Sequence, residues 1–332
     1  RSLTSHKEQL EAMKVWLDNA LAAGAVPVVT GQNGDMDTVG SAVALSSYHS
    51  GMLSCGLHLG RVAKKMVSKY DAPFRKITEK GTAWPQYMGG IVIVDAGSPD
   101  QVGFDLPDVP LLVIDHHATN GWDLKEEDLM LQWDVRATTE IITQFLSNHA
   151  PNCLSTNVRK MLLAGLITDT GRFKHADQSS FNTASVLLED SNIDYAEFSE
   201  HLEKEQTNPS ERGSLLRGMA RSKIHAAGDW SLVTTYAGTL EGRLASMLLG
   251  VGSDVTLVSR FRDGSTRLTA RATRNATLRG VHLGKIMQEV AQQHGGEGGG
   301  HDGAAGWTGE IDRIRAESSF IAHLTLQKEL NE

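Results

Sequence analysis

The chain has few cysteines and no long apolar run, and both shortages narrow its class. Cys55 and Cys153 are the only cysteines among 332 residues, and they show no pairing pattern. Such sparse cysteine is typical of a reducing compartment, so we expect a cytoplasmic protein. No apolar run reaches the roughly 18–20 residues that would span a bilayer, and no signal peptide is visible. We therefore expect no association with a membrane.

Basic charge and aromatic side chains are also scarce. The formal net charge is −8 at pH 7, and aromatic residues make up 6% of the chain. Proteins that track along long nucleic-acid strands need a basic, aromatic-lined groove, which this composition argues against. A small nucleotide with few charges remains a suitable substrate. With 40% hydrophobic residues, the chain can form substantial cores in two domains of ordinary size.

Aliphatic strands alternate with amphipathic helices in the first part of the chain. Strands are predicted at 25–30, 52–59, 90–94 and 111–114, and helices at 6–23, 39–48, 61–70, 135–149, 156–168 and 180–189. We expect Thr38 to cap the second of these helices and residues 71–88 to be irregular. The alternation predicts an α/β domain with a doubly wound, mostly parallel sheet, which we assign to residues 1–193.

The later part of the chain predicts a smaller α+β domain at 223–332, after a helical linker at 194–222. Strands are predicted at 231–236, 255–261, 267–273 and 314–329, and helices at 241–249 and 282–293. Asp263-Gly264 separates two of these strands and is a hairpin signal.

Acidic and imidazole side chains follow the predicted strand and helix ends of the first domain. They are Asp35, Asp37, Asp95, Asp115, His116, His117 and Asp169. Parallel sheets place their chemistry past the carboxyl ends of the strands, so we expect these side chains to converge. Carboxylate and imidazole ligands suit manganese, and phosphate-ester hydrolysis commonly uses two metals about 3.5–4 Å apart. For Asp35 or Asp37 alone, a structural role in a turn is the more common one.

Four ordered motifs resemble those of the DHH phosphoesterases. They are Asp35-x-Asp37 with Gly40-Ser41, Val94-Asp95-Ala96-Gly97, Asp115-His116-His117, and Thr168-Asp169-Thr170-Gly171-x-Phe173. The run from Gly298 to Gly306 is similar to the signature of the DHH-associated C-terminal domain. The fourth motif looks most like that of the nanoRNase and pAp-phosphatase branch. The exonuclease RecJ and family II pyrophosphatase share the catalytic plan.

The resemblance implies a role for each of these residues. It implies one cation bound by Asp35 and Asp95, and a second bound by Asp37, His116 and Asp169, with Asp95 bridging the two. His117 would lie beside the scissile phosphate, and Asp115 would orient a ligand imidazole, so both are expected to be catalytic. The expected cofactor is Mn²⁺, as one ion or two, with Mg²⁺ as the alternative.

One position departs from the family pattern. Gly31 stands where the first motif of the family usually has a histidine, and glycine has no side chain that could bind a metal. Gln32 or Asn33 could offer an amide oxygen, and His58 or His175 an imidazole from elsewhere. The chain could then be a one-metal enzyme, a two-metal enzyme with an altered site, or a nucleotide-binding protein that has lost catalysis.

The glycine-rich run of the second domain predicts a grip on the substrate. Glycines let backbone N–H groups approach a phosphate closely, and such nests bind anions. We expect Gly299, Gly300 and His301 to contact the substrate. The resemblance implies the same for the strand residue Arg271, which could grip a phosphate bidentately. A flexible loop and an exposed strand arginine are the alternatives.

These features favour a metal-dependent phosphoesterase that hydrolyses short nucleotides: nanoRNA, linear or cyclic dinucleotides, or pAp. One alternative keeps the family and changes the substrate, giving a (poly/pyro)phosphatase or a single-strand exonuclease. The other is a catalytically degenerate nucleotide sensor, which Gly31 would explain. A homodimer is expected by analogy alone.

Overall fold

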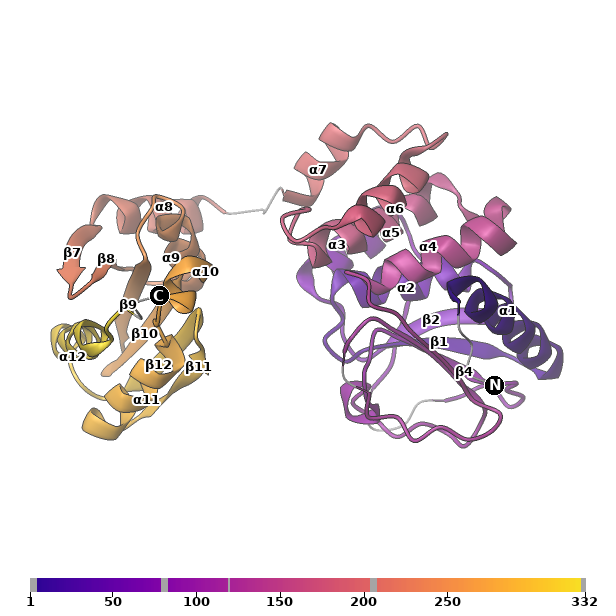
Figure 1. Ribbon diagram of the computed structural model, residues 1–332, viewed down its shortest axis with the longest axis horizontal. Helices are drawn as coiled ribbons and strands as arrows, with labels where there is room; N and C mark the ends of the chain where they lie inside the picture. Colours follow the sequence, from indigo (N-terminus) through magenta and orange to yellow (C-terminus); the bar gives the residue numbers. More distant parts are fainter. Residues whose placement is uncertain (1–4, 79–82, 119, 204–207, 330–332) are drawn as a thin grey trace. The chain divides into compact units, whose positions relative to one another are not determined.

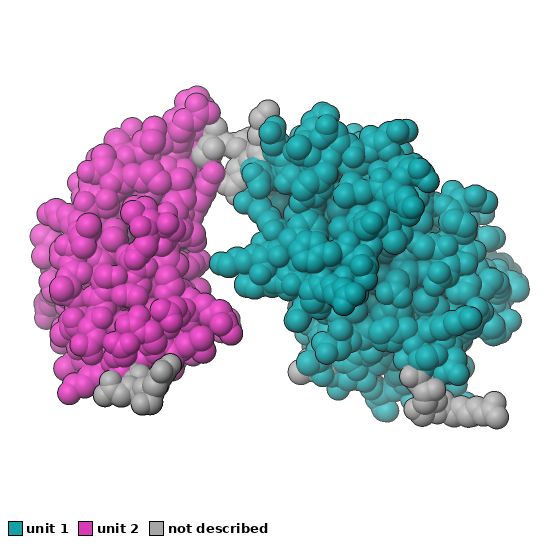
Figure 2. Space-filling model, turned by 45° about the horizontal axis from the view of Figure 1, so that its top comes forward, with its two compact units in different colours: residues 1–204 teal, residues 205–332 magenta. Residues whose placement is uncertain are grey.

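The computed structural model describes residues 5–78, 83–118, 120–203 and 208–329. It separates into two compact units, residues 1–204 and 205–332, which are drawn in different colours in Figure 2. Helix α7 (Tyr195–Glu203) ends the described part of the first unit, and α8 (Pro209–Ala220) begins that of the second. Over these described ranges, the structure has no helix that is both long enough and apolar enough to cross a membrane.

A six-stranded parallel sheet forms the centre of the first unit. Its strands are β1 (Val26–Thr30), β2 (Met52–Gly56), β3 (Arg75–Lys76), β4 (Ile91–Val94), β5 (Leu111–Asp115) and β6 (Leu129–Gln132). Their order is β3-β2-β1-β4-β5-β6, and every neighbouring pair is parallel. The predicted α/β class is confirmed. The order reverses between β1 and β4, and ligands bind at such a switch point in open parallel sheets.

The two faces of this sheet are covered differently. Helices α1 (His6–Ala23), α2 (Met36–Ser46), α3 (Arg61–Lys69), α4 (Thr138–His149), α5 (Thr156–Asp169) and α6 (Gln178–Leu188) pack into the core on one face (Figure 1). Right-handed connections place the segments after β4 and β5 on the other face. In their described residues (95–110, 116–118 and 120–128), those segments contain only the 3₁₀ turn η1 (Pro99–Gln101), and Val102, Phe104 and Trp122 pack against the sheet there. A doubly wound fold usually has a second layer of helices on this face, and here irregular segments cover it instead.

Three local predictions in the first unit need correction. Helix α2 begins at Met36, and its N-cap is Asp35, whose Oδ1 accepts the N–H of Thr38 at 3.1 Å; the predicted Thr38 cap is wrong. Strand β6 was not predicted from the sequence. The stretch 71–88, predicted to be irregular, contains the two-residue edge strand β3.

The second unit contains a mixed sheet in the order β11-β12-β10-β9-β8-β7. Its strands are β7 (Lys223–Ala227), β8 (Trp230–Tyr236), β9 (Val255–Arg262), β10 (Ser265–Ala272), β11 (Glu297–His301) and β12 (Ala304–Gly309). Helices α10 (Arg274–Leu278), α11 (Leu283–His294) and α12 (Arg313–Leu326) contribute to the core on one face, and α8 and α9 (Glu241–Leu249) to the core on the other. Neighbouring strands are antiparallel except for the parallel pair β8–β9.

The predicted final strand at 314–329 is wrong, because this segment is helix α12. Asp312 caps the helix by accepting the N–H of Arg315 at 2.9 Å. Ala316, Phe320 and Leu324 recur every four residues and are fully buried, which is a helical period. Ile314, whose position beside charged residues resembled strand alternation, is 67% exposed.

Candidate metal and phosphate site

Asp37 is held at the carboxyl edge of the first sheet by the start of another helix. It lies in the first turn of α2 and is 1% exposed. Its two carboxylate oxygens accept the backbone N–H groups of Thr138 at 2.7 Å and Thr139 at 2.9 Å. The positive end of a helix dipole favours a carboxylate at this place. These two donors were not predictable from the sequence, because the predicted helix starts at residue 135 and the observed one starts at Thr138.

Asp95 follows β4 in a left-handed backbone conformation, with φ 58°. For a residue other than glycine, this conformation costs roughly 1–3 kcal/mol and is common at functional sites. The carboxylate is nearly buried, and its Oδ1 accepts the hydroxyl of Thr138 at 3.2 Å. Thr138 therefore contacts both Asp37 and Asp95, and it ties the ends of two chain segments that are far apart in sequence.

The two histidines after β5 face different partners. His116 Nε2 lies 3.4 Å from Asp95 Oδ1 and 3.5 Å from Asp169 Oδ2, while its Nδ1 lies 3.3 Å from the carbonyl oxygen of Val135. His117 Nδ1 lies 2.7 Å from Oδ1 of Asp115, a residue with no exposed surface. The other oxygen of Asp115, Oδ2, is buried and has no hydrogen-bond partner.

Two sets of side chains in the described part of the chain are close enough to hold a metal ion. One is Asp37, His116 and Asp169, and the other is Asp95, His116 and His117; the ligand atoms of each set lie within 4.8 Å of one another. The first set matches the ligands expected for the second cation. His116 belongs to both sets. Carboxylate oxygens and imidazole nitrogens are suitable donors for a divalent transition metal, so these residues fit the cofactor that the sequence implies.

Burial, and after it the crowding of carboxylates, raises the pKa values of Asp37 and Asp169 at this site. Burial raises the pKa of Asp169 to about 6, and burial also raises the pKa of Asp37 well above its usual range. Burial lowers the pKa of His116, but the nearby carboxylates of Asp95, Asp37 and Asp169 raise it to about 9 overall. A bound cation would offset this concentration of negative charge, which is a second reason why the residues fit a metal.

Asp35 lies beside the two donor sets and is held by local contacts. Besides capping α2, it accepts the side-chain N–H of Asn33 through Oδ2 at 2.7 Å. Burial raises the pKa of Asp35, and the charge of Asp95 raises it further. Neither of the two three-residue sets includes Asp35, His58 or His175.

The backbone around Gly31 leaves little room for a side chain. A Cβ atom at this position would lie 2.9 Å from the carbonyl oxygen of Asp95 and 3.3 Å from Oδ1 of Asn33. The N–H of Gly31 donates to Thr38 Oγ1 at 2.9 Å. The backbone at Gly31 therefore lies close to the backbone at Asp95, and no space the size of an imidazole is left at this position.

The glycine-rich run of the second unit is a β-hairpin, β11–β12, and not a loop. A Cβ on Gly298 would lie 2.0 Å from the carbonyl oxygen of Met287 in α11, and one on Gly284 would lie 2.3 Å from that of Gly300. These glycines let the helix lie directly on the strand. The alternative of a flexible loop is therefore wrong, because Glu297–His301 pairs in register with Ala304–Thr308, and β11 is an edge strand of the sheet.

Three of the four predicted substrate contacts share one face of this second sheet. Arg271 pairs with Ala304, which pairs with His301, so the arginine and the histidine lie in one row. Gly299 lies two residues from His301 on the same strand and therefore on the same face. A Cβ on Gly299 would meet nothing within 4 Å, so this face is open there. Gly300 alternates to the opposite face, where a Cβ would lie 2.6 Å from the oxygen of Ala304.

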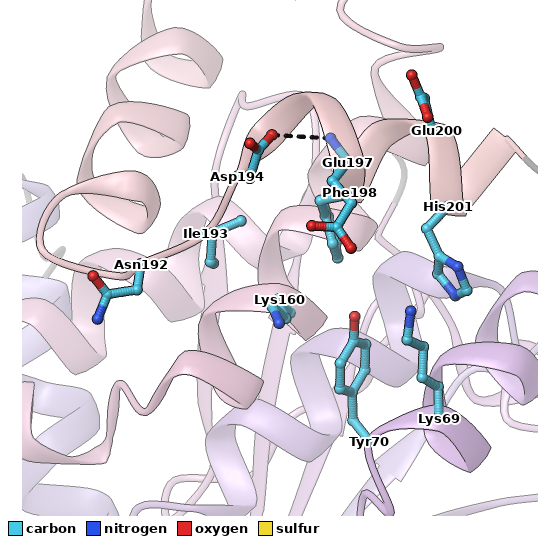
Figure 3. A pocket seen from close by; sticks show the side chains of 10 residues that line it. All are labelled: Lys69, Tyr70, Lys160, Asn192, Ile193, Asp194, Glu197, Phe198, Glu200 and His201. Carbon is cyan, nitrogen blue, oxygen red and sulfur yellow. Dashed lines mark hydrogen bonds between the residues drawn. The ribbon is translucent and has the colours of Figure 1, made fainter.

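A cavity of about 390 Å³ in the first unit has a different lining. Lys69, Tyr70, Lys160, Asn192, Ile193, Asp194, Glu197, Phe198, Glu200 and His201 surround it (Figure 3). Both lysine amino groups lie over the ring of Tyr70, at 5.6 Å for Lys69 and 5.0 Å for Lys160. Asp194 accepts the N–H of Glu197 at 3.0 Å and so stabilises the start of α7. None of the metal-donor residues lines this cavity. The candidate metal site is therefore recognised by its converging side chains and not by this cavity.

Family comparison agrees with this geometry. Residues 25–166 match the DHH family, N-terminal domain, and residues 238–324 match the DHHA1 domain. The two matches together cover more than half of the chain, in the order that the sequence motifs predict. The chain belongs to the DHH family of phosphoesterases, which are hydrolases.

Individual proteins match this chain over most of its length. The chain is 29% identical over 301 residues to the uncharacterized protein MJ0988 of Methanocaldococcus jannaschii, covering 87% of this chain and 88% of the relative. A crystal structure of an exopolyphosphatase-related protein from Bacteroides fragilis aligns with a TM-score of 0.66, at 14% identity, over 98% of this chain and 97% of that one. The second likeness shows that the fold is shared.

Proposed function

We propose that this protein hydrolyses phosphate esters of short nucleotides with the help of a divalent cation, Mn²⁺ being the first choice and Mg²⁺ the alternative. The observation that carries the proposal is the pair of donor sets that share His116 and combine residues that follow β1, β4 and β5. Asp37, His116 and Asp169 would hold one cation, and Asp95 lies within reach of the same imidazole. A cation in such a site, when bound, makes water a better nucleophile and stabilises phosphoryl oxygens.

The protein's own residues support the rest of the chemistry. His117 is 42% exposed in its side chain and therefore accessible to a substrate. When both ring nitrogens carry a proton, His117 donates Nδ1–H to the buried Asp115 and can donate Nε2–H to a phosphate oxygen. This pair gives His117 a fixed orientation, which is the role that a buried carboxylate commonly has beside a functional imidazole.

Short nucleotides are the preferred substrate class for two reasons. The net charge of −8 disfavours long polyanions, whose binding depends on many basic contacts. The row of Arg271 and His301 offers two side chains that can donate to a phosphate or two, although Arg271 is half-buried beside α9. We place the activity in the cytoplasm because of the sparse cysteines.

The alternative with a specific observation behind it is a nucleotide-binding sensor. Gly31 removes one family imidazole, and the close approach of the Asp95 carbonyl leaves little room for a replacement. An intact Asp37, His116 and Asp169 set favours catalysis over its loss. Inorganic polyphosphate or pyrophosphate is the other candidate substrate, and single-strand exonuclease activity is a third candidate.

The test is a hydrolysis panel of pAp, linear and cyclic dinucleotides, nanoRNA, longer oligonucleotides, pyrophosphate and tripolyphosphate, each with Mn²⁺ and with chelator. We expect chelator-sensitive release of nucleotide from pAp or a dinucleotide. Turnover of inorganic substrates alone would replace the nucleotide assignment with a phosphatase. Tight binding of a nucleotide without turnover of any substrate would favour the sensor.

A further inference from the structure

The turn directly after Asp169 has an unusual backbone. Gly171, Arg172 and Phe173 adopt three successive left-handed conformations, with φ 57°, 61° and 63°. Two of the three are not glycine, and this conformation is strained for a residue with a side chain. Strain of this kind persists only where the surroundings fix it. The turn therefore places the side chain of Phe173 in a position that an ordinary helix end would not provide.

Phe173 is the centre of a partly exposed aromatic cluster. Its ring stacks on that of Phe181 in α6, with centroids 5.4 Å apart and planes 19° apart, and it lies 6.3 Å from the ring of Tyr195 at a tilt of 48°. Phe181 is 55% exposed and Tyr195 is 37% exposed. Rings that only filled the core would be buried, so the outer surfaces of these two are available to a planar partner.

The cluster is attached to the segments that carry the metal donors. The N–H of Phe173 donates to Thr170 Oγ1 at 3.0 Å, and the N–H of Arg172 donates to the carbonyl of Ile167 at 2.7 Å, so the turn folds back onto the end of α5, where Asp169 lies. On the other side of the cluster, the neighbours of Phe181 are fixed to α4. Ser179 and Ser180 donate to Glu140, at 2.7 and 3.2 Å.

Basic side chains accompany the aromatic ones. Arg172, Lys174 and His175 are all exposed on the same turn. Arg172 lies 3.5 Å from Glu203, an exposed pair that salt weakens. Aromatic rings interleaved with cations are typical of surfaces that bind single-stranded nucleotides, where the rings stack on bases and the cations meet phosphates.

We propose that Phe181 and Tyr195, supported by Phe173, form a platform on which a nucleobase of the substrate stacks. This inference rests on the proposed function and names its substrate class more narrowly: the site prefers phosphate esters that carry a base over inorganic polyphosphates. Stacking of a base on an aromatic side chain stabilises the bound substrate, so the platform contributes mainly to substrate capture. It does not touch the reacting phosphate.

The experiment compares Phe181→Ala, Tyr195→Ala and the double variant with the wild type. The matched control is Phe261→Ala, because Phe261 is also 55% exposed but lies on β9 of the other unit. The readouts are kcat and KM for a linear diadenylate, and the inhibition constant of tripolyphosphate, which has no base. A Phe181→Trp variant keeps a stacking surface and serves as the rescue.

We expect the double variant to raise KM for diadenylate at least tenfold, with kcat and the inhibition constant of tripolyphosphate within twofold of the wild type. Phe261→Ala should leave all three unchanged, and Phe181→Trp should keep a low KM. An unchanged KM in the double variant would overturn the platform, as would an equal loss for diadenylate and tripolyphosphate.

A wild type that hydrolyses no nucleotide would contradict the proposed function without deciding on the platform. The same variants are then compared by calorimetric binding of diadenylate. At least tenfold weaker binding in the double variant alone would support the platform, and equal binding, or no binding to the wild type, would overturn it.

Discussion

The candidate functional regions of the two sheets differ in their side chains. At the edge of the first sheet, side chains converge: Asp37, His116 and Asp169 bring ligand atoms within 4.8 Å of one another. On the hairpin of the second sheet, side chains are missing. Gly298 lets α11 approach the strand, and Gly299 leaves the opposite face open. The first region depends on the carboxylate and imidazole groups of its side chains, and the second depends on the absence of side chains at its glycines.

The largest expected effect comes from changing a converging side chain. Asp95→Asn keeps the size of the group and its contact with Thr138 but removes the charge. We expect hydrolysis to fall by about a thousandfold or more, because the mutation weakens both the metal site and its charge balance. Steady-state kinetics at saturating Mn²⁺ measure this. Asp100→Asn, on the exposed η1 turn, is the control and should keep full activity. Wild-type turnover by the Asp95→Asn enzyme would exclude Asp95 from the site.

Neighbouring glycines of the hairpin should respond differently to the same substitution. Gly298→Ala places a Cβ 2.0 Å from a backbone oxygen of α11, whereas Gly299→Ala meets nothing within 4 Å. We expect Gly298→Ala to lower the free energy of unfolding by about 3 kcal/mol, as overpacking does, and Gly299→Ala to change it by less than about 0.5 kcal/mol. Denaturant unfolding gives both numbers. Equal losses would mean that α11 does not lie on β11 in this way.

Metal affinity should depend on pH, because a cation must displace protons from its ligands. The pKa of His116 is raised to about 9 and that of Asp169 to about 6. The apparent affinity for Mn²⁺ should therefore fall about tenfold for each pH unit below 9, and more steeply below 6. Calorimetric titrations from pH 6 to pH 9 would reveal this slope. A flat profile would show that His116 is not a ligand.

His116 and Asp169 should also make the stability of the metal-free protein depend on pH, and this stability should fall as the pH rises. A folded-state pKa above the ordinary value stabilises the protein at low pH. The contribution of His116 is present below pH 6.5 and is lost as the pH rises through about 9, and that of Asp169 is lost as the pH rises from 3.8 through about 6. In chelator, the melting temperature should fall between pH 6 and pH 9, and Mn²⁺ should remove this fall.

The smallest expected effect is on the open face of the second sheet. His301→Ala should raise KM about fivefold to tenfold and leave kcat unchanged, because a hydrogen bond to a charged group contributes about 1.5–3 kcal/mol when made and part of it is replaced by water. His294→Ala, at the end of α11, is the control. A change in kcat with an unchanged KM would assign His301 to the chemical step instead of substrate capture.

The sequence predicted four of the six strands of the first sheet, because these four are short aliphatic runs with clear ends, whereas β3 and β6 were missed. Ile91–Val94 and Leu111–Ile114 locate Asp95 and Asp115 directly, and parallel pairing then brings their carboxyl ends together. The family resemblance already implied that Asp37, together with His116 and Asp169, would form one donor set. The contacts that hold the two aspartates could not be predicted. They depend on Asp35 being the N-cap of α2 and on the N–H groups of Thr138 and Thr139, about a hundred residues away in the chain.

The second unit was harder to predict because its glycines fit two structures equally well. A run such as Gly298–Gly300 is typical of a loop when read locally, and only the presence of α11 makes it a strand with a bare face. The helix α12 was missed for a similar reason, since alternating charges at its start suggested a strand. Tertiary packing determined both outcomes.

Titration of Mn²⁺ into the metal-free protein tests the central claim most directly, because His116 belongs to both donor sets. The account predicts measurable binding at pH 8 by the wild type and by His58→Ala, whose imidazole lies outside both sets, and a loss of at least a hundredfold in affinity for His116→Ala. No binding by the wild type, or unchanged binding by His116→Ala, would contradict a metal centre at this edge of the sheet.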